Sequence, residues 1–113
     1  MAKTNKPKKS VARMVLSATN AIRIIRRLAQ NSSAVFITAH ASKRMTQRKV
    51  TRLQVIECLM KGGITEGPAL DIKGNWKVTI SRVASGDQID VVVALDWDAE
   101  NASYVVVITV IRN

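Results

Sequence analysis

One short stretch of the sequence combines a titratable side chain with several cations. His40 is the only histidine, and Arg44 and Arg48 follow it at intervals of four residues. If the stretch is helical, this spacing places the three side chains on one side of the helix. Guanidinium groups grip phosphate oxygens in a forked geometry, and histidine is the side chain whose ordinary pKa lies nearest seven. The stretch therefore predicts a catalytic site that holds a phosphate and moves a proton.

Further cations extend the predicted site. Strict alternation along a strand places Lys77 on one face and Arg82 on the other, so a bend near Val83 would be needed to bring both into one cleft. Tyr104 could act as an acid or stack on a base. The residues predicted to bind nucleic acid are Lys43, Lys49, Arg52, Lys77, Arg82, Arg13, Arg23 and Arg27.

Ordinary structural roles fit the same residues. A lone histidine at a helix start is more often a cap or a partly buried, hydrogen-bonded residue. Arg44 could instead form an ion pair with Asp90 or Asp96. The single cysteine, Cys58, excludes an internal disulfide, and with one histidine it supplies too few ligands to predict a zinc site. No metal and no cofactor are predicted.

The charge is distributed unevenly along the chain. Residues 1–56 contain thirteen Lys or Arg and no Asp or Glu, whereas residues 57–113 contain five against eight. So long a run without a carboxylate predicts a surface for a polyanion, with nucleic acid as the leading partner. An acidic protein would give the same signal.

The length and hydropathy of the chain limit the class of protein to which it can belong. Its 113 residues fit one domain, and 47% hydrophobic residues favour a folded globule. No apolar run of about 18 residues is present, so no membrane span is expected. The basic N-terminus lacks the hydrophobic segment of a signal peptide, and a cytoplasmic location is expected.

The N-terminal third predicts a tail and one long helix. Residues 1–9 are polar and basic and predict a flexible tail. From Ser10, a candidate N-cap, to Gln30 the apolar residues recur at helical spacing, with Arg13, Arg23 and Arg27 on the opposite face. This helix could pack on the domain or against another chain, for example in a homodimer.

Shorter elements follow. Residues 34–38 predict a brief strand, and Thr38 could cap a helix that begins near Ala39. Thr51 and Gln54 have capping-box spacing for the next helix, which should stop in a left-handed conformation at 62–63.

The remainder predicts strands. They span 64–72, 76–83, 89–96 and 104–111, and Gly67-Pro68 favours an edge position for the first. The last is the most hydrophobic, which predicts a central strand covered on both faces. The whole predicts an α+β domain over residues 10–113, with N-terminal helices packed on a three- to four-stranded antiparallel sheet.

The run Ala39-His40-Ala41, followed by Lys43-Arg44-Met45, Arg48 and Val50, resembles the HA-x-x-R-M signature of a small bacterial and phage domain family of unknown function. That family is related at the level of fold to RelE/ParE-type toxins. The resemblance covers residues 35–113, which implies a RelE-like core, and leaves 10–30 as an extension. Lys49 departs from the glycine that the family carries there.

The resemblance implies a toxin-type protein that binds RNA and cleaves it without metal. An endoribonuclease of this kind would use His40 as the base and Arg44 and Arg48 as the phosphate clamp. Its partners would be RNA and an acidic antitoxin. The alternative is a non-enzymatic module of a phage or mobile element that binds nucleic acid or an acidic protein.

Overall fold

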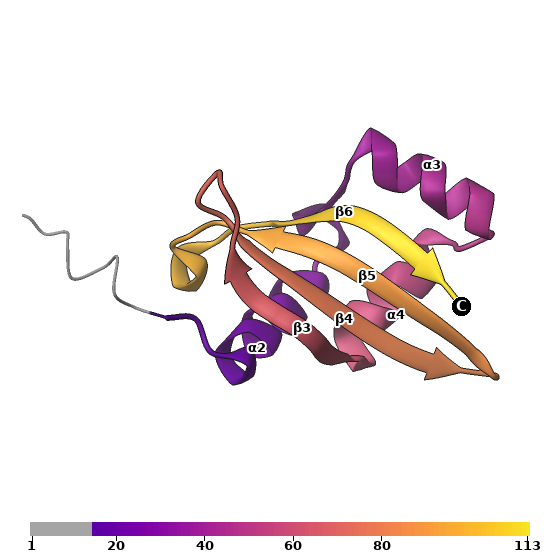
Figure 1. Ribbon diagram of the computed structural model, residues 1–113, viewed down its shortest axis with the longest axis horizontal. Coiled ribbons are helices and arrows are strands. Elements are labelled where there is room, and N and C mark those ends of the chain that lie inside the picture. Colours follow the sequence, from indigo (N-terminus) through magenta and orange to yellow (C-terminus); the bar gives the residue numbers. More distant parts are fainter. Residues whose placement is uncertain (1–14) are drawn as a thin grey trace, which may run out of the picture.

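The computed structural model describes residues 15–113, so the predictions for the tail at 1–9, for Ser10 and for Arg13 lie outside the described residues. The described chain forms three α-helices and one five-stranded sheet (Figure 1). In chain order they are α2 (Ala18–Ala29), β2 (Val35–Ile37), α3 (Ala39–Arg48), α4 (Arg52–Lys61), β3 (Gly63–Leu70), β4 (Trp76–Ala84), β5 (Asp87–Leu95) and β6 (Val105–Arg112). Short 3-10 turns lie at Ser32–Ala34 and Ala99–Asn101. The α+β class is confirmed.

The sheet differs from the predicted one in strand number and direction. Its order is β2-β6-β5-β4-β3, and β2 pairs with β6 in parallel while the other neighbours are antiparallel. The prediction of three or four antiparallel strands was wrong because a three-residue run carries too little alternation to reveal its partner. β5, not β6, is the central strand. β3 does lie at the edge, as Gly67-Pro68 indicated.

Two helices cover one face of this sheet and the other face remains uncovered by any described element (Figure 1). α2 and α4 lie on the covered face, where apolar side chains of β4 and β5 are buried. The core residues include Ala21, Ile24, Ile25, Leu28, Val55, Leu59, Val78, Ile80, Val91 and Val93. The apolar side of α2 therefore packs within its own chain.

The N-terminal helix is shorter than its apolar pattern predicts. Residues 15–17 are described and are not helical, and α2 begins at Ala18. The Ser17 side chain accepts a hydrogen bond from the Asn20 backbone N–H, which satisfies one of the free donors of the first turn. A single helix from Ser10 was therefore wrong, because Ser17 starts the helix within the run of apolar spacing.

The caps of the next two helices match the sequence. Thr38 accepts a hydrogen bond from Ala41 N, and Thr51 forms a full capping box with Gln54. The end of α4 does not match, because Gly62 is extended, with φ −78° and ψ 178°, and not left-handed. Glycine is required there because a Cβ would meet Cys58 O and Ser81 O at 2.6 Å. No described helix is long and apolar enough to span a membrane.

The left-handed residue lies instead at the end of α3. Lys49 has φ 58° and ψ 44°, a conformation that costs a residue with a Cβ about 1 kcal/mol or more. We expect Lys49→Gly to raise the free energy of unfolding by about 0.5–1 kcal/mol, measured by urea unfolding. Arg48→Gly is the control: it removes a neighbouring cation but places glycine at a helical position, so it should lower stability. A stability loss in both variants would contradict the argument.

Candidate nucleic-acid interface

Both ends of α3 are fastened to β6. At its start, Thr38 donates from its backbone N to Val107 O at 3.2 Å and from its hydroxyl to Ile108 O at 3.3 Å. At its end, the Arg112 guanidinium donates to Lys49 O at 2.9 Å. The helix therefore runs beside the second half of β6, in the direction of the strand, where β2 no longer pairs (Figure 1). These contacts fix the position of α3 along β6.

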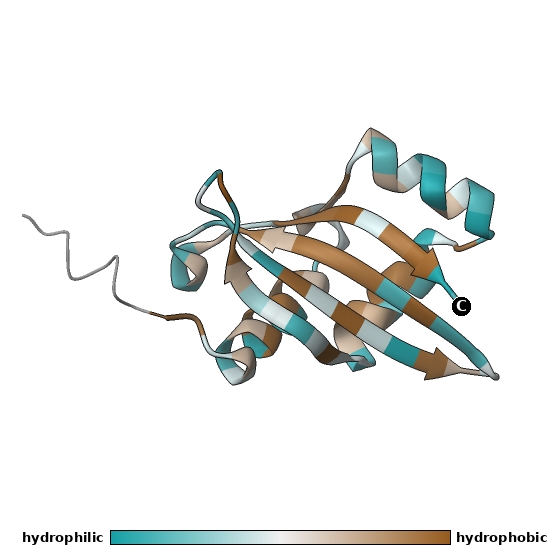
Figure 2. Ribbon diagram, in the orientation of Figure 1, coloured by the Kyte–Doolittle hydropathy of each residue, from teal (hydrophilic) through white to brown (hydrophobic). Residues whose placement is uncertain are grey.

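The predicted stripe exists on this helix. Ala41 and Met45 are buried against the domain, whereas His40 and Arg48 are exposed and Arg44 is half-buried. α3 is right-handed, runs along β6 and has its buried side against the sheet. The side of α3 that carries His40 and Arg44 therefore faces the same direction as the uncovered face of the sheet. Figure 2 shows that α3 is largely hydrophilic. Lys43 and Lys49 are exposed on the same helix and its C-cap.

The ordinary structural roles proposed for these residues are not found. Arg44 donates to Gln47 Oε1 at 3.1 Å, and among residues 15–113 no carboxylate lies within ion-pair distance of it. Asp90, one expected partner, instead accepts hydrogen bonds from Ser81 at 2.6 Å and from Gln88 at 3.1 Å. His40 is not the cap of α3, since Thr38 is, and no hydrogen bond joins its imidazole to another described residue.

The arginines outside α3 are engaged within the chain. Arg23 pairs with Glu100 at 2.6 Å, and Arg27 donates to Ala102 O at 3.1 Å. Arg26 donates to Gly62 O at 3.0 Å. These contacts tie α2 to the rest of the domain. Arg23 and Arg27, predicted to bind nucleic acid, therefore lie on the helix-covered side and already have oxygen partners.

Arg52 and Arg82 show the same pattern. Arg52 donates to Ser32 O at 2.7 Å and to Val35 O at 2.9 Å, which joins the start of α4 to the start of β2. Arg82 pairs with Glu57 of α4 at 3.2 Å. Strand alternation placed Arg82 opposite Lys77, and the structure agrees: Lys77 lies on the uncovered face. The two do not form one cleft.

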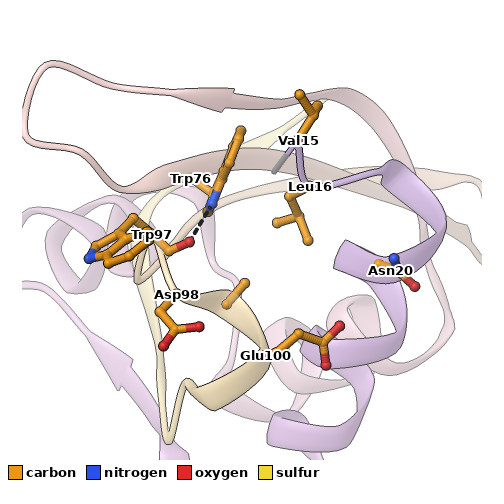
Figure 3. A pocket seen from close by; sticks show the side chains of 8 residues that line it. Val15, Leu16, Asn20, Trp76, Trp97, Asp98 and Glu100 are labelled. Atoms are coloured by element: carbon orange, nitrogen blue, oxygen red, sulfur yellow. Dashed lines mark hydrogen bonds between the residues drawn. The ribbon is translucent and has the colours of Figure 1, made fainter. Parts of the chain in front are cut away.

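The best-formed hollows of residues 15–113 are lined by residues outside α3. One of about 100 Å³ lies between the start of α2 and the 96–101 loop, lined by Leu16, Trp76, Asp98 and Glu100 (Figure 3). Its shape is held by the Trp76 indole N–H, which donates to Trp97 O at 2.9 Å. No α3 residue lines this hollow.

Cys58 is not a candidate nucleophile. It is 1% exposed, and its Sγ lies 3.4 Å from Ile80 O. Burial, followed by the nearby Asp90 carboxylate, raises the pKa of the Cys58 thiol to about 12, which keeps it protonated. Within residues 15–113 no three His, Cys, Asp or Glu side chains are grouped to hold a metal ion.

Sequence reasoning missed one feature of the uncovered face. The rings of Phe36 and Tyr104 stack with centroids 5.2 Å apart and planes 22° apart. The two residues are 68 positions apart in the sequence and meet only because β2 pairs with β6 in parallel. An aromatic residue in each of the two apolar runs was visible, but nothing local indicated the pairing.

Residues 37–112 match the model of a family described as a domain of unknown function, DUF4258. The matched region begins at the end of β2 and contains α3, α4 and the four strands that follow, while α2 precedes it. No curated protein and no solved structure matches the chain.

Proposed function

The chain belongs to the DUF4258 family, and we propose that it is an RNA-binding protein of the RelE-like toxin type that binds through α3. Its four cations there, Lys43, Arg44, Arg48 and Lys49, would contact the phosphates. The resemblance of residues 39–50 to the HA-x-x-R-M signature supports this assignment.

One observation carries the proposal. Of the eight arginines in residues 15–113, six donate to a carboxylate or a backbone oxygen elsewhere in the chain, and the other two are Arg44 and Arg48. Free guanidinium groups on one helix attract phosphate oxygens, whereas engaged ones stabilise the fold. Within residues 15–113, the two arginines without a carboxylate or backbone partner thus both lie on α3.

Cleavage is a further step of the same proposal and rests on His40. The imidazole would accept the proton of a ribose 2′-hydroxyl, whose oxygen then attacks the adjacent phosphorus. The bond to the 5′-oxygen breaks, and that oxygen takes a proton from the imidazolium. The Arg44 guanidinium, one turn away, would stabilise the added negative charge on the phosphorane. No metal is needed for this sequence of steps.

The test is to incubate the purified protein with labelled single-stranded RNA and EDTA, and to measure binding and cutting separately. We expect His40→Ala to bind within about twofold of the parent but to cut roughly 100-fold more slowly, the usual scale for a lost general base. Arg44→Ala should weaken both. Lys61→Ala, which removes an exposed cation from α4, is the control and should change neither.

The outcomes separate the two steps. If the intact protein binds no RNA at low salt, the proposal fails as a whole. RNA that is bound but left whole refutes cleavage alone, and growth arrest on expression would then also be absent. Binding to an acidic protein in place of RNA would favour the alternative, a non-enzymatic binding module.

A further inference from the structure

Two aromatic rings are exposed on the uncovered face where a folded chain would ordinarily bury them. Phe36 is 54% exposed and Tyr104 is 45% exposed, although they stack on each other. Neither belongs to the core on the covered face. Aromatic rings held in a fixed, half-exposed stack offer a flat apolar surface to a ligand.

The register of the strands shows which way the rings point. Val35 pairs with Val105, and both are fully buried toward the helices. Because side chains alternate along a strand, the next pair, Phe36 and Val106, faces the uncovered side. The same row continues through Ala94 to Lys77, since Val106 pairs with Ala94 and Ala94 with Lys77. The row therefore begins with a ring and ends with a cation.

The rings lie next to the start of α3. β2 ends at Ile37, Thr38 caps the helix, and His40 follows Phe36 by four residues. On the other side of Tyr104 the chain is acidic: Asp96 and Asp98 line a hollow beside that tyrosine. Carboxylates there repel phosphate groups, whereas the α3 cations attract them. A polyanion that contacts the rings would thus extend toward α3.

We propose that Phe36 and Tyr104 form a stacking platform for an unpaired base, so that the protein selects single-stranded over double-stranded RNA. This inference rests on the proposed RNA binding and specifies its substrate class. A base in a duplex has both faces covered by its neighbours, whereas an unpaired base can stack on an aromatic side chain. The α3 cations, which begin shortly after Phe36 in the chain, would contact the phosphates that flank the stacked base.

The experiment compares three ligands: a single-stranded RNA, the same RNA in a duplex, and an abasic ribose-phosphate oligonucleotide of equal length. Phe36→Leu and Tyr104→Leu remove a ring face but keep apolar packing, and folding is checked by circular dichroism. Trp97→Leu is the matched control, because Trp97 is 51% exposed but lies between Asp96 and Asp98.

We expect the parent to bind the single strand about tenfold more tightly than either other ligand, and each ring variant to lose about that factor on the single strand alone. The Trp97 variant should bind like the parent. If the parent binds single-stranded RNA and both folded ring variants bind it equally well, the platform is refuted while RNA binding stands. If the parent binds none of the three ligands, the proposed function fails and this inference fails with it.

Discussion

Replacing Gly62 by alanine is expected to lower the free energy of unfolding by about 3 kcal/mol, at the upper end of the cost of overpacking. A Cβ at this position would lie 2.6 Å from Cys58 O, 2.6 Å from Ser81 O and 2.9 Å from the Ile80 side chain. Two of these atoms are backbone oxygens of α4 and β4, so relief requires the helix to move away from the strand. That movement would open the core where both elements are buried.

Gly63→Ala is the control for this prediction. A Cβ on Gly63 meets no atom within 4 Å, although it is the adjacent residue of the same Gly-Gly pair. Thermal unfolding should place the Gly62 variant roughly 10–20 °C below the parent and the Gly63 variant within a few degrees of it. Equal shifts for the two variants would mean that Gly62 and Gly63 are required for backbone flexibility and not for close packing.

The packing around Gly62 shows which part of the fold was predictable from sequence. The cap at Thr38 and the capping box at Thr51 were correct, because both depend on residues three positions apart. The left-handed stop at 62–63 was wrong, since the glycine is required by Ser81 and Ile80, which are about 20 residues away. A local rule identified the residue but assigned it the wrong cause.

The pairing of β2 could not be predicted from the sequence for a similar reason. Val35–Ile37 is a three-residue run, and its parallel partner begins 70 residues later at Val105. The stack of Phe36 on Tyr104 follows from that pairing and was missed with it. The sequence of a short apolar run that follows a polar linker does not indicate which strand it will pair with.

The candidate site was predictable in its spacing but not in its free charges. Residues 40, 44 and 48 do share one side of a helix, as a period of four requires. Arg52 and Arg82 were predicted to bind nucleic acid, yet in the structure Arg52 donates to the Val35 carbonyl and Arg82 pairs with the Glu57 carboxylate. Which guanidinium is left for a ligand depends on acceptors that only the folded chain brings near.

A second large effect is expected when two α3 cations are removed together. Lys43→Gln with Arg48→Gln should weaken RNA binding at low salt by about 10- to 100-fold, since both side chains are exposed and each would release counterions from a phosphate. For a single strand, the slope of log affinity against log salt falls by about 0.7 per lost phosphate contact, hence by about 1.4 for the pair.

The matched control removes the same charge from elsewhere. Lys61→Gln with Lys73→Gln changes the net charge of the chain by the same two units, but Lys61 ends α4 and Lys73 lies in the turn before β4. A general attraction between a basic protein and RNA would lower both slopes alike. A phosphate-binding surface on α3 lowers only the first, because counterions are released where phosphates are contacted. Equal slopes in the two double variants would therefore refute α3 as the interface even if the protein binds RNA tightly.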